Sequence, residues 1–220
     1  MNVFDNIWQV GGDGLSASGD AAVYLVADRD RAVLIDAGTG AGHDRVVENI
    51  SACLPEAASI ENLFLTHCHY DHTGGAEKLR ESYHLKVIAH EQDAVFLEKG
   101  DNTVTAASWY GASLIPFTVD HKINRDTETF RIGETELQTI HWPGHSPGSI
   151  ILMLERAGKK IVFGQDVHGP LHPSLLSNRE DYLFSLNRLK TLEADILCEG
   201  HYGIIKGKEE VKRFISQFIN

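Results

Sequence analysis

The feature that most constrains this chain is a cluster of histidines and one aspartate that directly follows a short apolar run, residues 62–65. Three imidazoles and one carboxylate fall within six residues: His67, His69, Asp71 and His72. Imidazole nitrogens and carboxylate oxygens are ligands that borderline divalent metals accept. A loop that leaves a strand can direct successive side chains toward one point, which a regular helix could not do. We therefore interpret the cluster as a metal site rather than as a histidine-rich polar loop.

Three more candidate ligands stand where other expected strands end, each beside a glycine. They are His145, within the sequence Pro-Gly-His-Ser-Pro-Gly, then Asp166 and His201. Taken singly, each pattern is typical of a turn. Taken together with the first cluster, they supply the additional ligands that two neighbouring metal ions require.

The remaining sequence alternates short apolar runs with segments of helical periodicity. Strands are expected at residues 4–10, 22–27, 32–35, 62–65, 86–89, 135–142, 149–154, 160–163 and 195–198. Helices are expected at residues 43–54, 76–83, 91–98, 179–192 and 208–218. No linker, repeat or low-complexity run divides the chain. We therefore expect a single domain over residues 1–220, in which helices cover the outer faces of two sheets.

The composition limits the class of partner. Lys plus Arg number 20 and Asp plus Glu number 31, which gives a net charge of −11. Nucleic acids and anionic membranes attract the opposite charge balance. The three cysteines form no disulfide framework, no apolar run approaches the roughly 18 residues of a membrane span, and the first residues do not resemble a signal segment. We expect a cytoplasmic protein with a small-molecule substrate and neither a nucleic-acid nor a membrane partner. The sequence is compatible with a monomer and with a homo-oligomer.

The ordered ligand set resembles that of the metallo-β-lactamase-fold hydrolases, in particular their glyoxalase II-like and lactonase-like branch, and the resemblance covers nearly the whole chain. It implies an α/β fold, a four-layer αβ/βα sandwich of two mixed sheets flanked by helices. It also implies that one metal is held by His67, His69 and His145. A second metal would be held by Asp71, His72 and His201, and Asp166 would bridge the two.

The resemblance implies a metallo-hydrolase of the thioesterase or lactonase type. Two divalent ions, with Zn²⁺ expected and Fe or Mn as alternatives, would lower the pKa of a shared water from about 16 towards about 7 and provide hydroxide at neutral pH. The hydroxide would attack the carbonyl of a small thioester, lactone or related ester. Asp71 would then be catalytic as well as a ligand, because it can orient the nucleophile and pass on a proton. Tyr202 is a second catalytic candidate, as a donor to the substrate carbonyl, with a packed core tyrosine as the alternative.

Two rival activities resemble this one. A mononuclear iron persulfide dioxygenase has a very similar motif set, and metal identity would distinguish it. A metallo-nuclease needs basic grooves or a basic arm, and a chain of net charge −11 without a Lys/Arg cluster offers neither. Antibiotic hydrolysis is disfavoured by Asp166, because class B β-lactamases generally lack an aspartate at that position.

Several neighbouring residues allow two interpretations. Asp36 ends a strand and either accepts a hydrogen bond from a ligand imidazole or bonds to local backbone. His168 and His172 either line the substrate pocket or lie exposed on a loop. The aromatic segment 109–117 forms either an apolar wall over the metals or a loop packed into the core. Cys68 is expected to point away from the metals as a small buried thiol.

Overall fold

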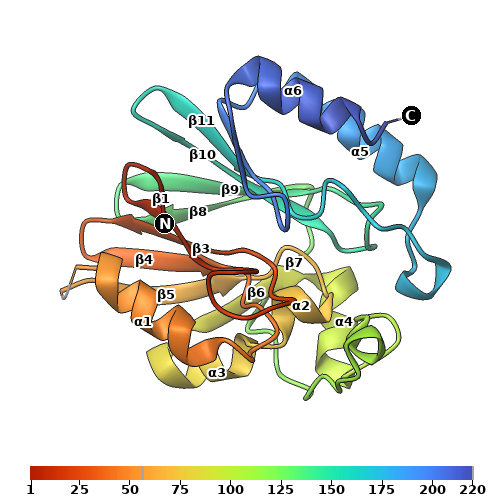
Figure 1. Cartoon of the computed structure of the whole chain (residues 1–220), viewed down its shortest axis with the longest axis horizontal. Helices are drawn as coiled ribbons and strands as arrows, with labels where there is room; N and C mark the ends of the chain where they lie inside the picture. Colours follow the sequence, from red (N-terminus) through yellow and green to blue (C-terminus); the bar gives the residue numbers. More distant parts are fainter. Residues whose placement is uncertain (56, 220) are drawn as a thin grey trace.

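The strands of the two halves of the chain form two sheets that lie face to face (Figure 1). The computed structural model describes residues 1–55 and 57–219. In spatial order, the first sheet contains β1 (Asn2–Phe4), β2 (Ile7–Gly11), β3 (Val23–Asp28), β4 (Arg31–Ile35), β5 (Ser59–Phe64), β6 (Lys86–His90) and β7 (His121–Ile123). Neighbouring strands from β1 to β4 pair antiparallel, and those from β4 to β7 pair parallel.

The second sheet is built from the second half of the chain. Its strands, in spatial order, are β13 (Ile204–Lys206), β12 (Ile196–Cys198), β11 (Lys159–Phe163), β10 (Ile150–Arg156), β9 (Thr135–His141) and β8 (Thr127–Ile132). The β11–β12 pair is parallel, and its neighbours are antiparallel. Both sheets are therefore mixed, as the family resemblance implies.

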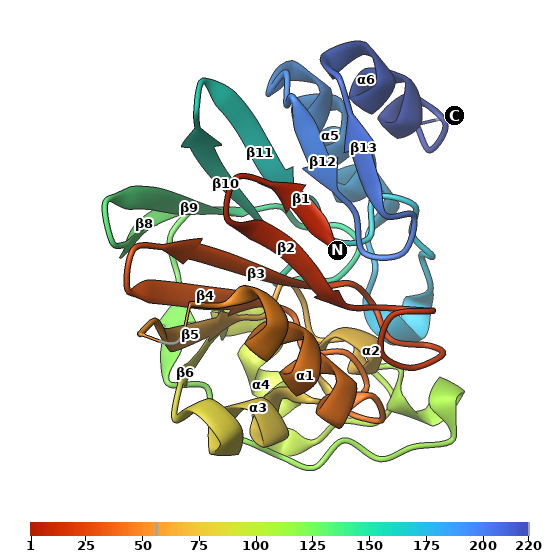
Figure 2. The same cartoon turned by 60° about the vertical axis from the view of Figure 1, so that its left-hand side comes forward.

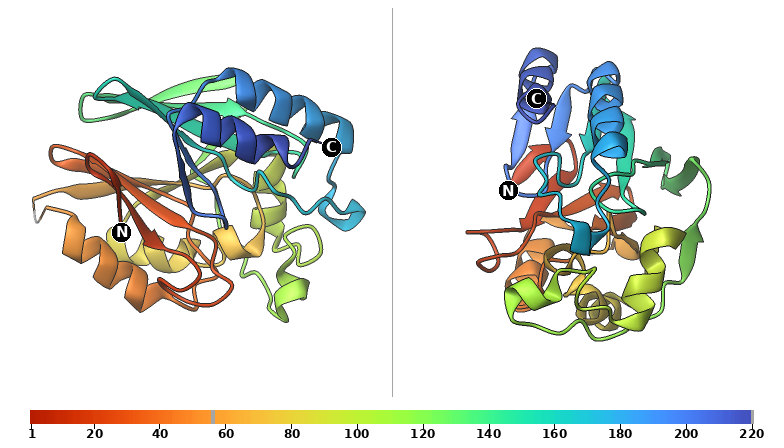
Figure 3. Two further views of the ribbon diagram at one scale, coloured as in Figure 1. Left: turned by 45° about the horizontal axis from the view of Figure 1, so that its top comes forward. Right: turned by 90° about the vertical axis from the view of Figure 1, so that its right-hand side faces the viewer.

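Helices cover the outer face of each sheet, and Figure 3 shows the four layers that result. The first sheet carries α1 (His43–Cys53), α3 (Ala76–Tyr83) and α4 (Glu91–Lys99). The second carries α5 (Arg179–Thr191) and α6 (Lys208–Ser216), coloured blue in Figures 1 and 2. This arrangement is the metallo-β-lactamase fold, and the expected four-layer sandwich is confirmed. No helix in the described part of the chain is long and apolar enough to cross a membrane.

The central strands are buried on both faces, so alternate side chains enter different cores. In β3, Leu25 packs under the helices of the first sheet, whereas Tyr24 and Val26 point between the sheets. In β11, Phe163 lies between the sheets and Val162 contacts the layer formed by α5 and α6. This period of two is the pleat of a strand with an apolar layer on either side. The central core fixes how the two sheets face each other.

Some local expectations were wrong or incomplete. The expected strand 4–10 is two strands, because Asn6 takes a left-handed turn (φ 57°) between β1 and β2. The expected loop after β5 contains a helical turn, α2 (Tyr70–Thr73). Strands β7, β8 and β13 were missed: β7 and β13 have only three residues each, and β8 is an edge strand with mostly exposed or half-buried side chains. The other expected strands and helices are confirmed to within a few residues at their ends.

Removing a large side chain from the layer between the sheets should destabilise the fold strongly. Phe163 is 1% exposed and its ring lies edge-on to Tyr24, with the centroids 5.3 Å apart. Phe163→Ala should lower the free energy of unfolding by about 3–5 kcal/mol through lost burial and a residual cavity. Phe184→Ala is the matched control, because Phe184 is 67% exposed; its effect should stay within about 0.5 kcal/mol. Chemical denaturation measures both, and equal effects would contradict this account of the core.

Candidate metal centre

The candidate ligands lie in four segments, each of which follows a strand. His67, His69 and the helical turn α2 come after β5, and His145 follows β9. Asp166 follows β11 and His201 follows β12. The sheets thus deliver ligands from both halves of the chain to one edge of the sandwich. The structure brings together all seven residues that the sequence singled out as ligands.

The first group consists of three buried histidines and Asp166. The possible ligand atoms of His67, His69, His145 and Asp166 all lie within 4.8 Å of one another. His67 Nε2 is 3.0 Å from His69 Nδ1, and His145 Nε2 is 3.4 Å from Asp166 Oδ2. Three imidazoles converging on one point form a set that suits a borderline divalent cation.

The second group shares Asp166 with the first. Its possible ligand atoms, from Asp71, His72, Asp166 and His201, again lie within 4.8 Å of one another. His72 Nε2 is 3.1 Å from Asp166 Oδ1, and His201 Nε2 is 3.1 Å from Asp71 Oδ2. Asp166 Oδ2 lies close to both His145 (3.4 Å) and His201 (3.5 Å), so the shared carboxylate contacts both groups, and this arrangement suits a dinuclear site.

Several buried polar atoms of the two groups are placed to bind a metal ion rather than to hydrogen-bond to one another. His72 Nε2, His145 Nε2 and Asp166 Oδ1 are buried and have no hydrogen-bond partner among the described residues. A buried polar atom without a partner costs about 1–3 kcal/mol. Three such atoms side by side are expected where cations complete the bonding. The donor set and these atoms together fit two divalent metal ions.

Burial and charge set the protonation of the ligands in the metal-free chain. Burial lowers the pKa of His67 well below its usual value and that of His69 to about 3, so both imidazoles are neutral, as metal binding requires. Burial opposes a proton on His72 as well, but the nearby carboxylates, Asp166 foremost, raise its pKa well above the usual value. Burial would raise the pKa of Asp166, yet the facing imidazoles of His72, His145 and His201 hold it well below the usual range. Without metal, the ionised Asp166 therefore faces a protonated His72, and a bound cation would take the place of that proton.

Asp36 fixes the orientation of the ligands beside it, so the interpretation that it accepts from a ligand imidazole is confirmed. Its Oδ2 lies 2.7 Å from His72 Nδ1, which leaves Nε2 of that ring for the second group. Its Oδ1 accepts from the Thr66 backbone N–H at 2.8 Å, and Thr66 Oγ1 lies 3.0 Å from His67 Nδ1. A carboxylate behind a ligand histidine holds the ring in one tautomer.

Glu199 is a residue that the sequence analysis missed. It is fully buried, and its Oε2 accepts from the backbone N–H groups of His201 (2.7 Å) and Tyr202 (2.8 Å). Its Oε1 lies 2.8 Å from His168 Nδ1. Asp166, His168 and Glu199 also form a possible ligand group, but these hydrogen bonds already occupy the Glu199 carboxylate. An acidic residue directly after the apolar strand 196–198 was the available signal.

A cavity of about 190 Å³ opens over the second group. Four candidate ligands and His168 line it, and the rest of its wall is mostly apolar: Ala106, Trp109, Tyr110, Pro170 and Leu175. Each interpretation of the aromatic segment 109–117 holds for part of it. Trp109 and Tyr110 line the cavity, as a wall would, whereas Leu114 and Phe117 are buried in the core. His168 lines the cavity, and His172 is exposed with its ring edge-on to Trp109.

Neither Tyr202 nor Cys68 lines this cavity. Tyr202 is 62% exposed, so it is not a core residue, and its ring packs against His168, Phe214 and Phe218. It does not belong to the cavity lining, and a contact with substrate stays a prediction. Cys68 is fully buried in the apolar core, as expected.

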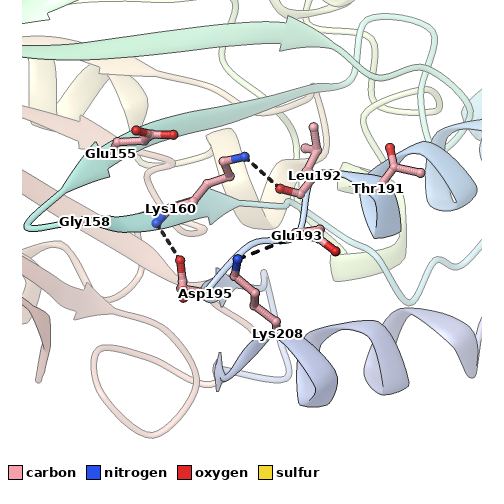
Figure 4. Close-up of a pocket in the computed structure, with 8 residues that line it drawn as sticks. All are labelled: Glu155, Gly158, Lys160, Thr191, Leu192, Glu193, Asp195 and Lys208. Carbon is pink, nitrogen blue, oxygen red and sulfur yellow. Dashed lines mark hydrogen bonds and ion pairs between the residues drawn. The ribbon is translucent and has the colours of Figure 1, made fainter.

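A second hollow, of about 300 Å³, lies at the opposite end of the second sheet (Figure 4). Its two ammonium groups are engaged within the protein. Lys160 Nζ donates to the Leu192 carbonyl at 2.9 Å, and Lys208 Nζ lies 3.9 Å from Glu193. The hollow gathers none of the residues of the two metal-binding groups, whereas four of them line the smaller cavity.

Known proteins resemble this chain in sequence and in fold. The model of the metallo-β-lactamase superfamily matches residues 18–201. The acyl-coenzyme A thioesterase MBLAC2 of Gallus gallus is 30% identical, over 91% of this chain and 78% of the relative. The probable metallo-hydrolase YqgX of Bacillus subtilis is 30% identical, over 82% of this chain and 83% of the relative. A HARLDQ-motif mutant of a metallo-β-lactamase from Cronobacter sakazakii has the same fold, with a TM-score of 0.80 at 23% identity over 99% of this chain and 92% of that one. The chain belongs to the metallo-β-lactamase superfamily.

Proposed function

We propose that this protein is a metal-dependent hydrolase that cleaves a small thioester, lactone or related ester. The observation that carries the proposal is the pair of His/Asp groups that share Asp166 beside a largely apolar cavity. Two divalent ions, expected to be Zn²⁺, would be held by His67, His69 and His145 on one side and by Asp71, His72 and His201 on the other. Bound there, such ions would act as Lewis acids and lower the pKa of a water molecule.

The side chains of the cavity suit an acyl group of modest size. Trp109, Tyr110 and Leu175 form an apolar surface next to the ligands Asp71 and His201. The residues that line the cavity include no Lys or Arg, so the described wall offers no cation to a phosphate or carboxylate handle. The MBLAC2 relatives are acyl-coenzyme A thioesterases, and this name supports a thioester as the first substrate class to test. A charged carrier would lie outside the cavity.

Asp71 has the position of a catalytic carboxylate. It is 5% exposed, it lines the cavity, and its Oδ2 lies 3.1 Å from His201 Nε2. From there it can accept a hydrogen bond from the attacking water, orient that water toward the substrate carbonyl and carry a proton to the leaving group. The shared carboxylate of Asp166 would set the separation of the two cation sites.

A substrate panel tests the proposal. We expect the purified protein to hydrolyse S-butyryl-N-acetylcysteamine or a short γ-lactone, followed by thiol release or acid release. Dialysis against a chelator should lower the rate at least about 100-fold, and added Zn²⁺ should restore it. The absence of ester or thioester hydrolysis, with oxygen consumed in the presence of glutathione persulfide, would instead support the iron dioxygenase.

Asp166→Asn should lower metal content and activity together. The substitution replaces one oxygen of the shared carboxylate by an amide nitrogen, which does not bind a divalent cation in this setting. We expect the metal content to fall by at least half and kcat/KM to fall at least about 100-fold. Asp13→Asn, at an exposed loop residue, should change neither quantity. Full metal content and activity in Asp166→Asn would remove this residue from the centre.

Asp71→Asn and Tyr202→Phe separate the two proposed catalytic residues. Asp71→Asn should lower kcat about 10²–10⁴-fold, the range for loss of a general base. Tyr202→Phe removes only a hydroxyl from an exposed ring outside the cavity lining, so we expect less than a threefold change in kcat/KM. Steady-state kinetics on the best substrate of the panel measure both. A loss above tenfold in Tyr202→Phe would establish the hydroxyl as a substrate contact.

A further inference from the structure

The carboxylate of Asp93 joins two loops that carry metal ligands. Asp93 lies in the first turn of α4 and is fully buried. Its Oδ2 accepts from the Cys68 backbone N–H at 2.8 Å and from Ser146 Oγ at 2.6 Å. Its Oδ1 accepts from the Gly148 backbone N–H at 2.6 Å. One side chain thus takes three short hydrogen bonds from segments that are 25 to 55 residues away in sequence.

These partners are the neighbours of three ligands. Cys68 stands between His67 and His69, and Ser146 directly follows His145. His67 and His69 follow a strand of the first sheet, whereas His145 follows a strand of the second. Asp93 therefore connects the two halves of the three-histidine group from behind, without contributing an atom to it.

The surroundings of Asp93 leave little freedom for these loops. A Cβ atom on Gly148 would come within 2.6 Å of the Asp93 backbone nitrogen, so the loop approaches the helix as closely as glycine allows. Ser146 Oγ also lies 2.8 Å from Ser149 Oγ, which in turn accepts from the Ser146 backbone N–H at 3.0 Å. A buried carboxylate is costly unless it is fully hydrogen-bonded, and bonds to an ionised acceptor are the stronger ones.

The second group is supported by other carboxylates. Asp36 bonds to His72 and Glu199 bonds to the backbone of His201. The hydrogen bonds of the Asp93 side chain involve no residue of that group. The loss of Asp93 should therefore affect the two groups unequally.

We propose that Asp93 is a positioning residue that aligns His67, His69 and His145, so that its removal weakens metal binding at the three-histidine group selectively. The inference rests on the metal centre of the proposed function and extends it to a residue that neither touches the cavity nor binds metal. It adds Asp93, behind the three-histidine group, to the carboxylates Asp36 and Glu199 that bond to residues of the second group.

Two parent variants isolate the groups for the test. His72→Ala removes a ligand of the second group and keeps the three-histidine group intact. His145→Ala removes a ligand of the three-histidine group and keeps Asp71, His72 and His201. Asp93→Ala is introduced into each parent, and Co²⁺ affinity is measured by visible absorption with a competing chelator. We expect a loss of about 10–100-fold in the His72→Ala parent, the usual effect of losing the group behind a ligand. We expect less than a threefold loss in the His145→Ala parent.

Asp28 provides a matched control. Its Oδ2 also accepts from two backbone N–H groups and one hydroxyl, of Glu134 and Thr135, at 2.8 to 3.0 Å. It too joins the first sheet to the second, but at the end remote from the ligands. Asp28→Ala should lower thermal stability without changing Co²⁺ affinity in either parent. Asp93→Asn replaces Asp93→Ala in the test if the latter does not fold, because it keeps the shape of the side chain and one acceptor oxygen. It should show a smaller loss of Co²⁺ affinity with the same selectivity.

The outcomes separate this inference from the proposed function. Equal losses in both parents, or no loss in the His72→Ala parent, would overturn the selective role of Asp93 while leaving the metal centre intact. Failure of the unmutated chain to bind Co²⁺ would overturn the proposed function and this inference with it.

Discussion

The buried carboxylate of Asp166 is the interaction on which the site depends. It is 4% exposed and stands between two groups of imidazoles, with one oxygen 3.1 Å from His72 and the other 3.4 Å from His145. A charge buried this deeply is tolerated only with opposite charge and hydrogen-bond donors around it. The histidines alone leave polar atoms unsatisfied, whereas two cations would satisfy both groups at once. The ligands around it come from both sheets and meet at one edge of the sandwich.

The scaffold behind the centre is built from further carboxylates. Asp36 orients His72, Glu199 holds the loop of His201, and Asp93 joins the loops of the three remaining histidines. All three are buried, and each takes part in hydrogen bonds, as a buried carboxyl group requires. Ligands that come from loops of two different sheets are thereby held by a rigid interior. Rigid support of this kind is what a preorganised reactive site requires.

Much of this could be predicted from the sequence, because the ligands follow apolar strands and stand beside glycines. Local patterns carry that information, and the histidine cluster and His145 were found in this way. Asp93 and Glu199 could not be assigned, since their partners become neighbours only when the chain folds. Tyr202 shows the same limit: adjacency to a ligand does not give the direction of a side chain, and its ring turned outward. The edge strand β8 was missed because its exposed polar residues interrupt the apolar pattern.

The metal content of the native protein tests the central claim most directly. The protein should be purified without added metal and without nickel affinity resin, and its metals quantified by plasma mass spectrometry. The two groups that share Asp166 predict about two divalent ions per chain, mainly zinc. About one iron per chain with little other metal would contradict the dinuclear hydrolase and favour oxygen-dependent sulfur chemistry.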